Sequence, residues 1–334
     1  MTALAPFPPA TAPLAVPCAQ PRSSRLLPGV LGAGCVVAAL LVLRDDAALQ
    51  TWATVALAVV LQALPFLVLG VVISGAIAAF VPAGVLPRLL PRRPLLSVPV
   101  AGVAGLVLPG CECSSVPVAG RLVSAGAPPA AAFTFMLAAP AINPVVVVAT
   151  AVAFPGTPRV VVARVLASLL AAVVVGLIWS RYGPALDRCA SHDHGLATGT
   201  RARLVALRTG LVDDFAAAAG WLVLGAALAA TLQVVVPRSL LDGLAASPVL
   251  SVLALAALAV LLAVCSEADA FVAAGLSQFS LSARLAFLVV GPMVDVKLVA
   301  LQAGTFGWRF ALRFAPLALL TAIGSAVLVA AVLL

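Results

Sequence analysis

The chain has 334 residues, of which 64% are hydrophobic and only 9% are charged. A soluble globular domain is about half apolar and about one quarter charged, so this composition excludes a soluble fold. Several apolar runs exceed the roughly 20 residues that cross a bilayer, which predicts an all-α polytopic protein with lipid as its surroundings. The net charge of +8 does not indicate a nucleic-acid partner, because the arginines cluster in short loops between apolar runs.

The first part of the chain predicts one tail and three helical segments. Residues 1–25 are rich in Ala and Pro and predict a disordered tail, and the apolar run after them predicts a first transmembrane helix over 26–48. A long helix is expected over 51–81, with a kink at Pro65. Residues 95–108 are apolar but too short to span a bilayer, which predicts a half-helix.

The remaining apolar stretches predict a span broken near 140–144 and further helices over 160–180, 214–236, 249–264, 283–304 and 310–334. Between them, residues 181–210 form a long polar loop whose five arginines predict a cytoplasmic location. His192 and His194 lie in this loop as H-D-H. We interpret them as part of a solvated loop, since no further metal ligand accompanies them.

The second half of the chain repeats the first. F-L-V-L-G at 66–70 matches W-L-V-L-G at 221–225, and further along Cys113, Pro140 and Asn143 match Cys265, Pro292 and Asp295 at one constant spacing. We therefore predict two transmembrane repeats, over 49–180 and 211–334.

The arginine-rich loops fix the expected orientation of the two repeats. With the N-terminus and the 181–210 loop in the cytoplasm, the repeats have opposite orientations in a plasma (inner) membrane. The pattern predicts about seven full spans plus two helical hairpins, at 95–125 and 249–280. Inverted repeats with interrupted helices are typical of secondary transporters.

Polar residues gather where the predicted spans are interrupted, and a bilayer penalises each of them. The candidate substrate-binding residues are Cys111, Glu112, Cys113, Ser114, Asn143, Cys265, Ser266, Glu267, Asp269, Asp295 and Lys297. We expect Ser114 or Ser115 to cap the helix that follows Pro109 and Gly110, so that its positive end points at the thiols. Lys297 is expected to pair with Asp295 or with a glutamate, and Arg121 with Glu112.

The thiols Cys111, Cys113 and Cys265 are candidate ligands for a soft ion or a thiophilic metalloid. Each feature also has a structural interpretation. Buried cysteines often only pack, Glu267 and Asp269 are suited to capping a helix, and Asp295 with Lys297 can be a structural pair.

Four motifs carry a resemblance to a known family: C-E-C-S-S-V-P-V (111–118), L-A-A-P-A-I-N-P-V (137–145), C-S-E-A-D-A-F-V (265–272) and L-A-F-L-V-V-G-P-M-V-D-V-K (285–297). Through these motifs the chain resembles the YraQ/ArsP-like permeases, over about residues 50 to 330. The best-described members of that family export trivalent organoarsenicals. The resemblance implies a permease, with Cys111 and Cys113 as thiol ligands.

The leading hypothesis is a secondary permease for a small thiophilic solute, with export of a trivalent arsenical against protons. One alternative is a divalent metal-ion transporter that uses Glu112, Glu267, Asp269 and Asp295. Another is a membrane thiol-redox enzyme that uses Cys111 and Cys113. The sequence contains no phosphate-binding loop and no haem-attachment motif, so we expect neither a cofactor nor an enzyme. A homo-oligomer stays open.

Overall fold

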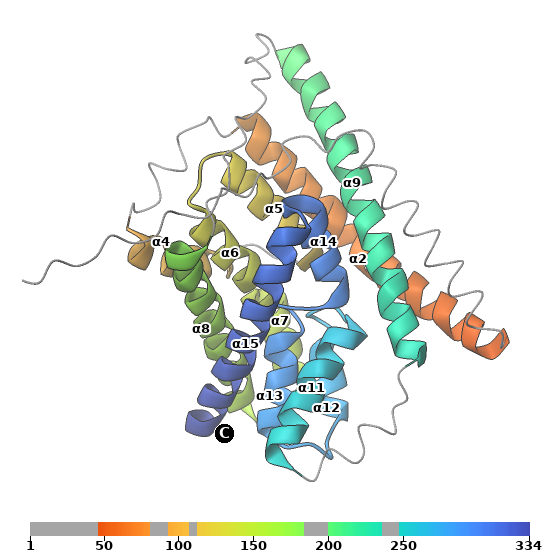
Figure 1. Cartoon of the computed structure of the whole chain (residues 1–334), viewed down its shortest axis with the longest axis vertical. Coiled ribbons are helices and arrows are strands. Elements are labelled where there is room, and N and C mark those ends of the chain that lie inside the picture. The colour runs from red at the N-terminus through yellow and green to blue at the C-terminus, as the bar shows by residue number, and fades with distance from the viewer. Residues whose placement is uncertain (1–45, 81–92, 107–111, 184–199, 236–246) are drawn as a thin grey trace, which may run out of the picture.

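The fold is described from a computed structural model, over residues 46–80, 93–106, 112–183, 200–235 and 247–334. These residues form helices and contain no strand, which confirms the predicted all-α membrane fold (Figure 1). The tail, the first predicted helix up to residue 45, Cys111 and the H-D-H sequence lie outside the described residues.

The described helices come in a similar order in each half. The first half contains α2 (Asp46–Phe80), α4 (Pro94–Ala104), α5 (Glu112–Ser124), α6 (Pro129–Ile142), α7 (Pro144–Ala153) and α8 (Pro158–Tyr182). The second half contains α9 (Thr200–Val235), α11 (Pro248–Leu262), α12 (Asp269–Gly275), α13 (Leu281–Val290), α14 (Val296–Phe306) and α15 (Trp308–Leu333). Several of these helices begin with a proline, which has no N–H to leave unbonded at a first helical position.

The long helices and the break near Asn143 agree with the sequence predictions. Within the described residues, four segments are long and apolar enough to cross a membrane, namely Ala48–Ile73, Pro129–Ala153, Pro158–Tyr182 and Trp308–Leu333. The second of these is interrupted at Asn143, between α6 and α7. Residues 291–295 separate α13 from α14, so the single helix expected over 283–304 is wrong. Pro292 has no N–H for the helical hydrogen-bond ladder, which favours an interruption here. The total of seven spans stays a prediction.

Helix α9 begins at Thr200, inside the segment that was predicted as a loop up to residue 210. The expected start near Asp214 is therefore wrong. The segment from Arg201 to Arg208 is rich in Ala, Arg and Leu, which are good helix formers, and contains neither Gly nor Pro. The arginines give this segment the low hydropathy of a polar loop, although the helix extends beyond its apolar part.

The expected caps of α5 are also wrong. The helix already includes Glu112 as its first residue, so Ser114 and Ser115 lie within its first turns rather than before it. The hydroxyl of Ser115 donates to the carbonyl of Glu112 at 3.1 Å, a local bond that serine makes readily inside a helix.

Helix α6 lies at the centre of the bundle, and every residue from Ala130 to Ile142 is buried. A helix that is hydrophobic all round is stable only when it is surrounded, and α4, α5 and α8 pack against it. Phe133 contacts the rings of Trp179 and Phe310 at centroid distances of 5.5 and 4.8 Å. These contacts tie α6 to α8 and α15.

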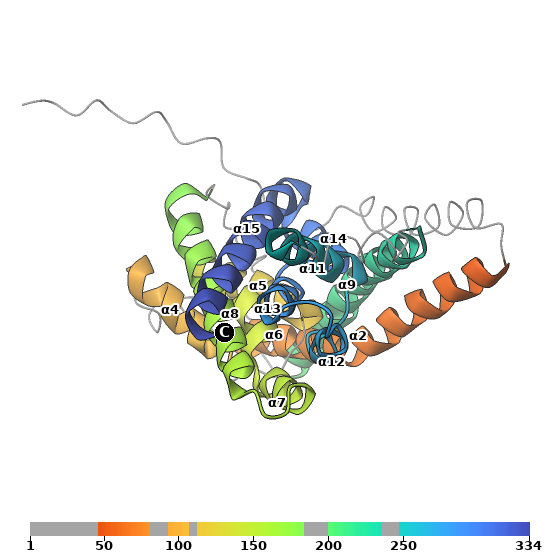
Figure 2. The same cartoon turned by 90° about the horizontal axis from the view of Figure 1, so that it is seen from below.

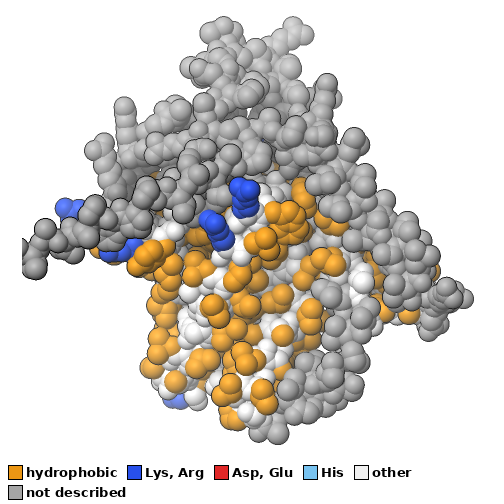
Figure 3. Space-filling view, in the orientation of Figure 1, with side chains coloured by type: hydrophobic (Ala, Val, Ile, Leu, Met, Phe, Trp, Pro, Cys, Tyr) orange, Lys and Arg blue, Asp and Glu red, His pale blue; other side chains and the backbone are white. Residues whose placement is uncertain are grey.

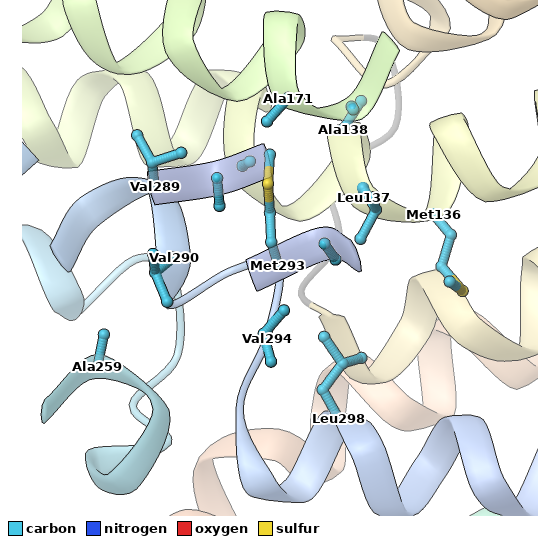
Figure 4. Packing of buried hydrophobic residues seen from close by; sticks show 14 of the residues in the cluster. Met136, Leu137, Ala138, Ala171, Ala259, Val289, Val290, Met293, Val294 and Leu298 are labelled. Atoms are coloured by element: carbon cyan, nitrogen blue, oxygen red, sulfur yellow. The ribbon is translucent and has the colours of Figure 1, made fainter. Parts of the chain in front are cut away.

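The link between α13 and α14 also packs into this core. Figure 4 shows Met293 pointing between α6 and α8, toward Ala171, with Leu137 of α6 beside it. Met293 is fully buried and Val294 nearly so. The backbone can therefore leave the helical path here, because its apolar side chains still fill the interior.

The outer surface is apolar. Leu57 on α2, Leu320 on α15 and Val332 on α15 have relative exposures of 58%, 70% and 77%. In Figure 3 hydrophobic side chains cover most of the visible described surface, and Lys and Arg side chains lie near its borders. Exposed apolar surface of this extent marks a face that meets lipid.

The long helices of the two halves run in opposite directions. Figures 1 and 2 show α2 and α9 crossing antiparallel, and α8 and α15 likewise. Both pairs are in contact.

Two glycines in the matching F-L-V-L-G and W-L-V-L-G sequences allow close helix contacts beside the polar residues. A Cβ atom on Gly70 would lie 2.5 Å from the Cα atom of Ser114, and one on Gly225 would lie 2.6 Å from the Cα atom of Lys297. Real Cβ atoms do not approach so closely to backbone. Gly70 therefore sets the distance from α2 to α5, and Gly225 that from α9 to α14.

We expect Gly225→Ala to destabilise the protein by about 1–3 kcal/mol, because α9 must move away from α14. Gly324→Ala on α15 is the matched control, since a Cβ there meets no atom within 4 Å. Thermal unfolding in detergent, followed by tryptophan fluorescence, measures both variants. A Gly225→Ala protein as stable as the Gly324→Ala protein would contradict the close contact.

Candidate functional site

The site is built around the buried ammonium group of Lys297, in the first turn of α14. Its Nζ atom lies 2.5 Å from Oε1 of Glu112 and 3.5 Å from Oδ2 of Asp295, and all three side chains are buried. Glu112 is the first residue of α5, and Asp295 immediately precedes α14. Lys297 therefore joins the two halves of the chain, and the expected pairing with Asp295 and a glutamate is present.

Backbone geometry holds the ammonium from a second side. Helix α11 ends at Ala263 in the left-handed conformation, with φ 48° and ψ 38°. It is the one non-glycine residue with positive φ in the part of the chain that the structure describes. Its carbonyl accepts a hydrogen bond from Nζ of Lys297 at 2.9 Å. An alanine in this conformation costs about 1–2 kcal/mol, and here the conformation supplies a polar partner to a buried charge.

Asp295 and Asn143 have the same structural role in the two halves. Oδ1 of Asp295 accepts from the N–H of Leu298 and caps α14, and Oδ1 of Asn143 accepts from the N–H of Val146 and caps α7. The second carboxylate oxygen of Asp295 faces Lys297. Asn143 also donates to the carbonyl of Ala139 at 3.1 Å. Asn143 therefore bonds to the backbone on both sides of the break between α6 and α7, which is a structural role.

The two described thiols of the site are fully buried, and neither forms a disulfide. Sγ of Cys265 lies 3.8 Å from Nζ of Lys297, and Cys113 follows Glu112 at the start of α5. Ser266, next to Cys265, donates to Oε2 of Glu112 across a long 3.5 Å contact. The sulfur atoms therefore belong to the same polar region as the Glu112–Lys297 pair.

A second buried ion pair lies on the other side of Ser266. Nη2 of Arg164 on α8 lies 2.8 Å from Oδ2 of Asp269, and it also donates to the carbonyl of Ser266 at 3.1 Å. Nη1 of Arg164 donates to Oγ1 of Thr150 on α7 at 2.8 Å. Ser266 thus touches both ion pairs, one through its hydroxyl and the other through its carbonyl.

Arg164 was not among the predicted site residues, although the sequence carried a signal for it. It is an arginine inside the apolar run of α8, and its exposure is only 1%. An ionisable residue within a transmembrane segment is a functional candidate by default. Its partner Asp269 is far away in the sequence, so local pattern could not pair the two.

The other predicted residues lie as follows. Glu267 is half-buried in the turn between Ser266 and α12. Ser114 is buried, and its backbone packs closely against Gly70 of α2. Arg121 is in the last turn of α5, whereas Glu112 at the first residue pairs with Lys297.

The arrangement disfavours a divalent cation between these carboxylates. The ammonium group of Lys297 already occupies the position between Glu112 and Asp295. Within the described ranges, no three His, Cys, Asp or Glu side chains come together as a metal site would require.

An apolar helical bundle whose helices are interrupted at buried, paired charges defines a membrane protein of the permease class. The chain belongs to the ArsP_1 family, described as "Predicted permease", whose model matches residues 48–334. This confirms the family resemblance inferred from the four motifs.

Two relatives support the assignment. The chain is 34% identical over 259 residues to "UPF0718 protein YcgR" of Bacillus subtilis, a match that covers 76% of this chain and 88% of the relative. It is 31% identical over 268 residues to a Streptococcus mutans protein named "Putative two-component membrane permease complex subunit", covering 77% and 88%. No solved structure matches the chain.

We expect Lys297→Met to destabilise the protein more than Glu112→Gln does. The first change leaves two buried carboxylates without their cation, whereas the second leaves Lys297 paired with Asp295. Removing one partner of a buried pair typically costs about 3–5 kcal/mol. The midpoint of thermal unfolding and the folded yield measure the order. A Glu112→Gln protein less stable than Lys297→Met would show that Asp295 does not share the charge.

Proposed function

We propose that the protein is a secondary active transporter for a small thiophilic solute, rather than an enzyme. The observation that carries this proposal is the position of two buried thiols outside any disulfide, Cys113 and Cys265, beside the Glu112–Lys297 ion pair. Sulfur selects soft ions and metalloids, and the buried charges can change partners when the solute binds.

Two inverted repeats, over 49–180 and 211–334, are part of the proposal. The antiparallel pairs α2 with α9 and α8 with α15 support it, as do the matching caps Asn143 and Asp295. The N-terminus and the arginine-rich segment 181–210 are proposed to be cytoplasmic, because this places most arginines on the inner side of a plasma membrane.

The proposed cargo is a trivalent arsenical, moved outward in exchange for protons. Trivalent arsenic is thiophilic, and Cys111, Cys113 and Cys265 are its proposed ligands. The carboxylates of Glu112, Asp295 and the half-buried Glu267 are the proposed proton carriers. Glu112 and Asp295 contact Lys297, which also lies 3.8 Å from Sγ of Cys265, and Glu267 follows Cys265 by two residues.

Transport of a divalent or soft metal ion is the second candidate, supported by the number of membrane carboxylates. It would require the ammonium of Lys297 to leave its place between Glu112 and Asp295. The arsenical reading needs no such vacancy and is therefore preferred.

We also propose that the protein works in a complex. The Streptococcus mutans relative is named as a subunit of a two-component permease complex. A second copy of this chain or a different subunit would meet the apolar surface in the membrane.

Cys113→Ser and Cys265→Ser are each expected to weaken binding of methylarsenite by roughly tenfold or more, equivalent to about 1.4 kcal/mol. Serine keeps the size of the side chain but loses the soft sulfur ligand. Binding to the purified protein is measured by calorimetry, with Cys189→Ser, between α8 and α9 in the sequence, as the control. Unchanged affinity in both site variants would exclude sulfur ligation there.

The metal-ion candidate predicts a different pattern. Glu267→Gln and Asp295→Asn would then abolish uptake of Zn²⁺ into inverted vesicles, whereas both serine variants would transport normally. Asp295→Asn keeps the cap of α14, as Asn143 does for α7, so a loss reports on charge rather than on the helix break.

A further inference from the structure

Two buried ion pairs cross between the halves of the chain, and they occupy comparable positions. Glu112 is the first residue of α5 and Asp269 is the first residue of α12, each in the short helix after an apolar half-helix. Each carboxylate takes its cation from the opposite half, Lys297 from α14 and Arg164 from α8. The similarity is one of place in the fold, since Asp269 matches Pro117 in the sequence alignment of the repeats.

Each pair spans a different contact between the halves. Helix α5 packs on α14, where Glu112 meets Lys297, and α12 packs on α7, whose Thr150 holds Arg164. In Figure 1 the first contact lies in the upper part of the bundle and the second in the lower part. Each pair therefore holds its own contact between the halves, and Ser266 lies between the two pairs.

We infer that Glu112–Lys297 and Asp269–Arg164 are the two gates of the transport pathway, each of which closes one side of the contact between the halves. The inference rests on the transport function proposed above. It assigns to Arg164 a positioning role that neither the family nor the relatives state.

The Asp269–Arg164 pair contains unsatisfied polar atoms, which favours opening of this contact. Nε of Arg164 and Oδ1 of Asp269 are buried, and neither has a hydrogen-bond partner among the described residues. A buried polar atom without a partner raises the free energy of the closed state. Separation of α12 from α7 would let water reach both atoms. Their hydration would then offset part of the free energy needed to break the ion pair.

Ser266 gives the gates a way to communicate. Its hydroxyl donates to Glu112 and its carbonyl accepts from Arg164. A displacement of α12 that moves Ser266 away from Arg164 therefore also changes the contact with Glu112. The state of one gate therefore affects the bonding at the other.

The test uses one cysteine reporter beside each gate. Ala273→Cys lies on α12 four residues after Asp269, and Val116→Cys lies on α5 four residues after Glu112, so each shares a helix face with its carboxylate. Both positions are fully buried. Ala322→Cys on α15 is the control, also fully buried and outside both contacts. An impermeant maleimide is added to either side of oriented vesicles that contain the full chain, and labelling is read peptide by peptide.

We expect Arg164→Gln to raise the labelling rate of Ala273→Cys by about tenfold or more from one side only, and to leave Val116→Cys unchanged from that side. Glu112→Gln should raise labelling of Val116→Cys from the opposite side. The charge exchange Arg164→Asp with Asp269→Arg should restore slow labelling. Ala322→Cys should stay protected throughout.

Labelling of both reporters from the same side would overturn the inference, and so would unchanged rates while Ala322→Cys is protected. If Arg164→Gln also exposes Ala322→Cys, Arg164→Lys replaces it, because lysine keeps the charge but cannot span Thr150, Asp269 and Ser266 together. A one-sided increase in that variant supports the gate, and no increase overturns it. The assay needs no solute, so it can succeed where methylarsenite binding fails, and the reverse.

Discussion

The central constraint on this protein is the burial of the Lys297 ammonium within an apolar bundle. Removing an ammonium or a carboxylate from water costs several kcal/mol even after a protein relaxes around it. That cost is tolerable only with good partners on several sides. Lys297 has two carboxylates, a backbone carbonyl and a nearby thiol, contributed by α5, the start of α14 and the end of α11. The interruptions of these helices are the structural consequence.

Broken helices solve a problem that continuous helices cannot. A continuous transmembrane helix uses its backbone groups internally and offers only side chains to a buried ligand. A break exposes N–H groups at the next helix start and carbonyls at the previous end. Here the side chain of Asp295 accepts from the N–H of Leu298 and faces Lys297, and the carbonyl of Ala263 accepts from Lys297. Backbone and side-chain groups therefore both stabilise the buried ammonium. The apolar linker residue Met293 keeps the interior filled at the same depth.

Hydrophobicity and proline explain why so much of the fold was predictable. Apolar runs placed the helices, and Pro140 and Pro144 placed the break near Asn143, because these signals are local. The break before Asp295 was missed, since one proline within a long apolar run is compatible with a continuous transmembrane helix. The early start of α9 at Thr200 was missed since charged helix formers resemble a loop by hydropathy alone. The pairing of Arg164 with Asp269 could not be predicted from the sequence, for a different reason. Asp269 lies 105 residues away, and no periodicity encodes a pairing that depends on packing of the halves.

The two halves differ in a way that makes each depend on the other. At the spacing that matches Asn143 to Asp295, the residue that corresponds to Lys297 is Val145, and the one that corresponds to Glu112 is Val264. The first half therefore holds Glu112 without its cation, and the second holds Lys297 with Asp295 as its one carboxylate partner among the described residues. A half inserted alone would bury charges with fewer partners, and the cost falls when α5 meets α14. The polar residues thus specify how the two halves associate. Leucines and valines that face lipid cannot do this, because moving an apolar side chain from lipid to protein changes its free energy little.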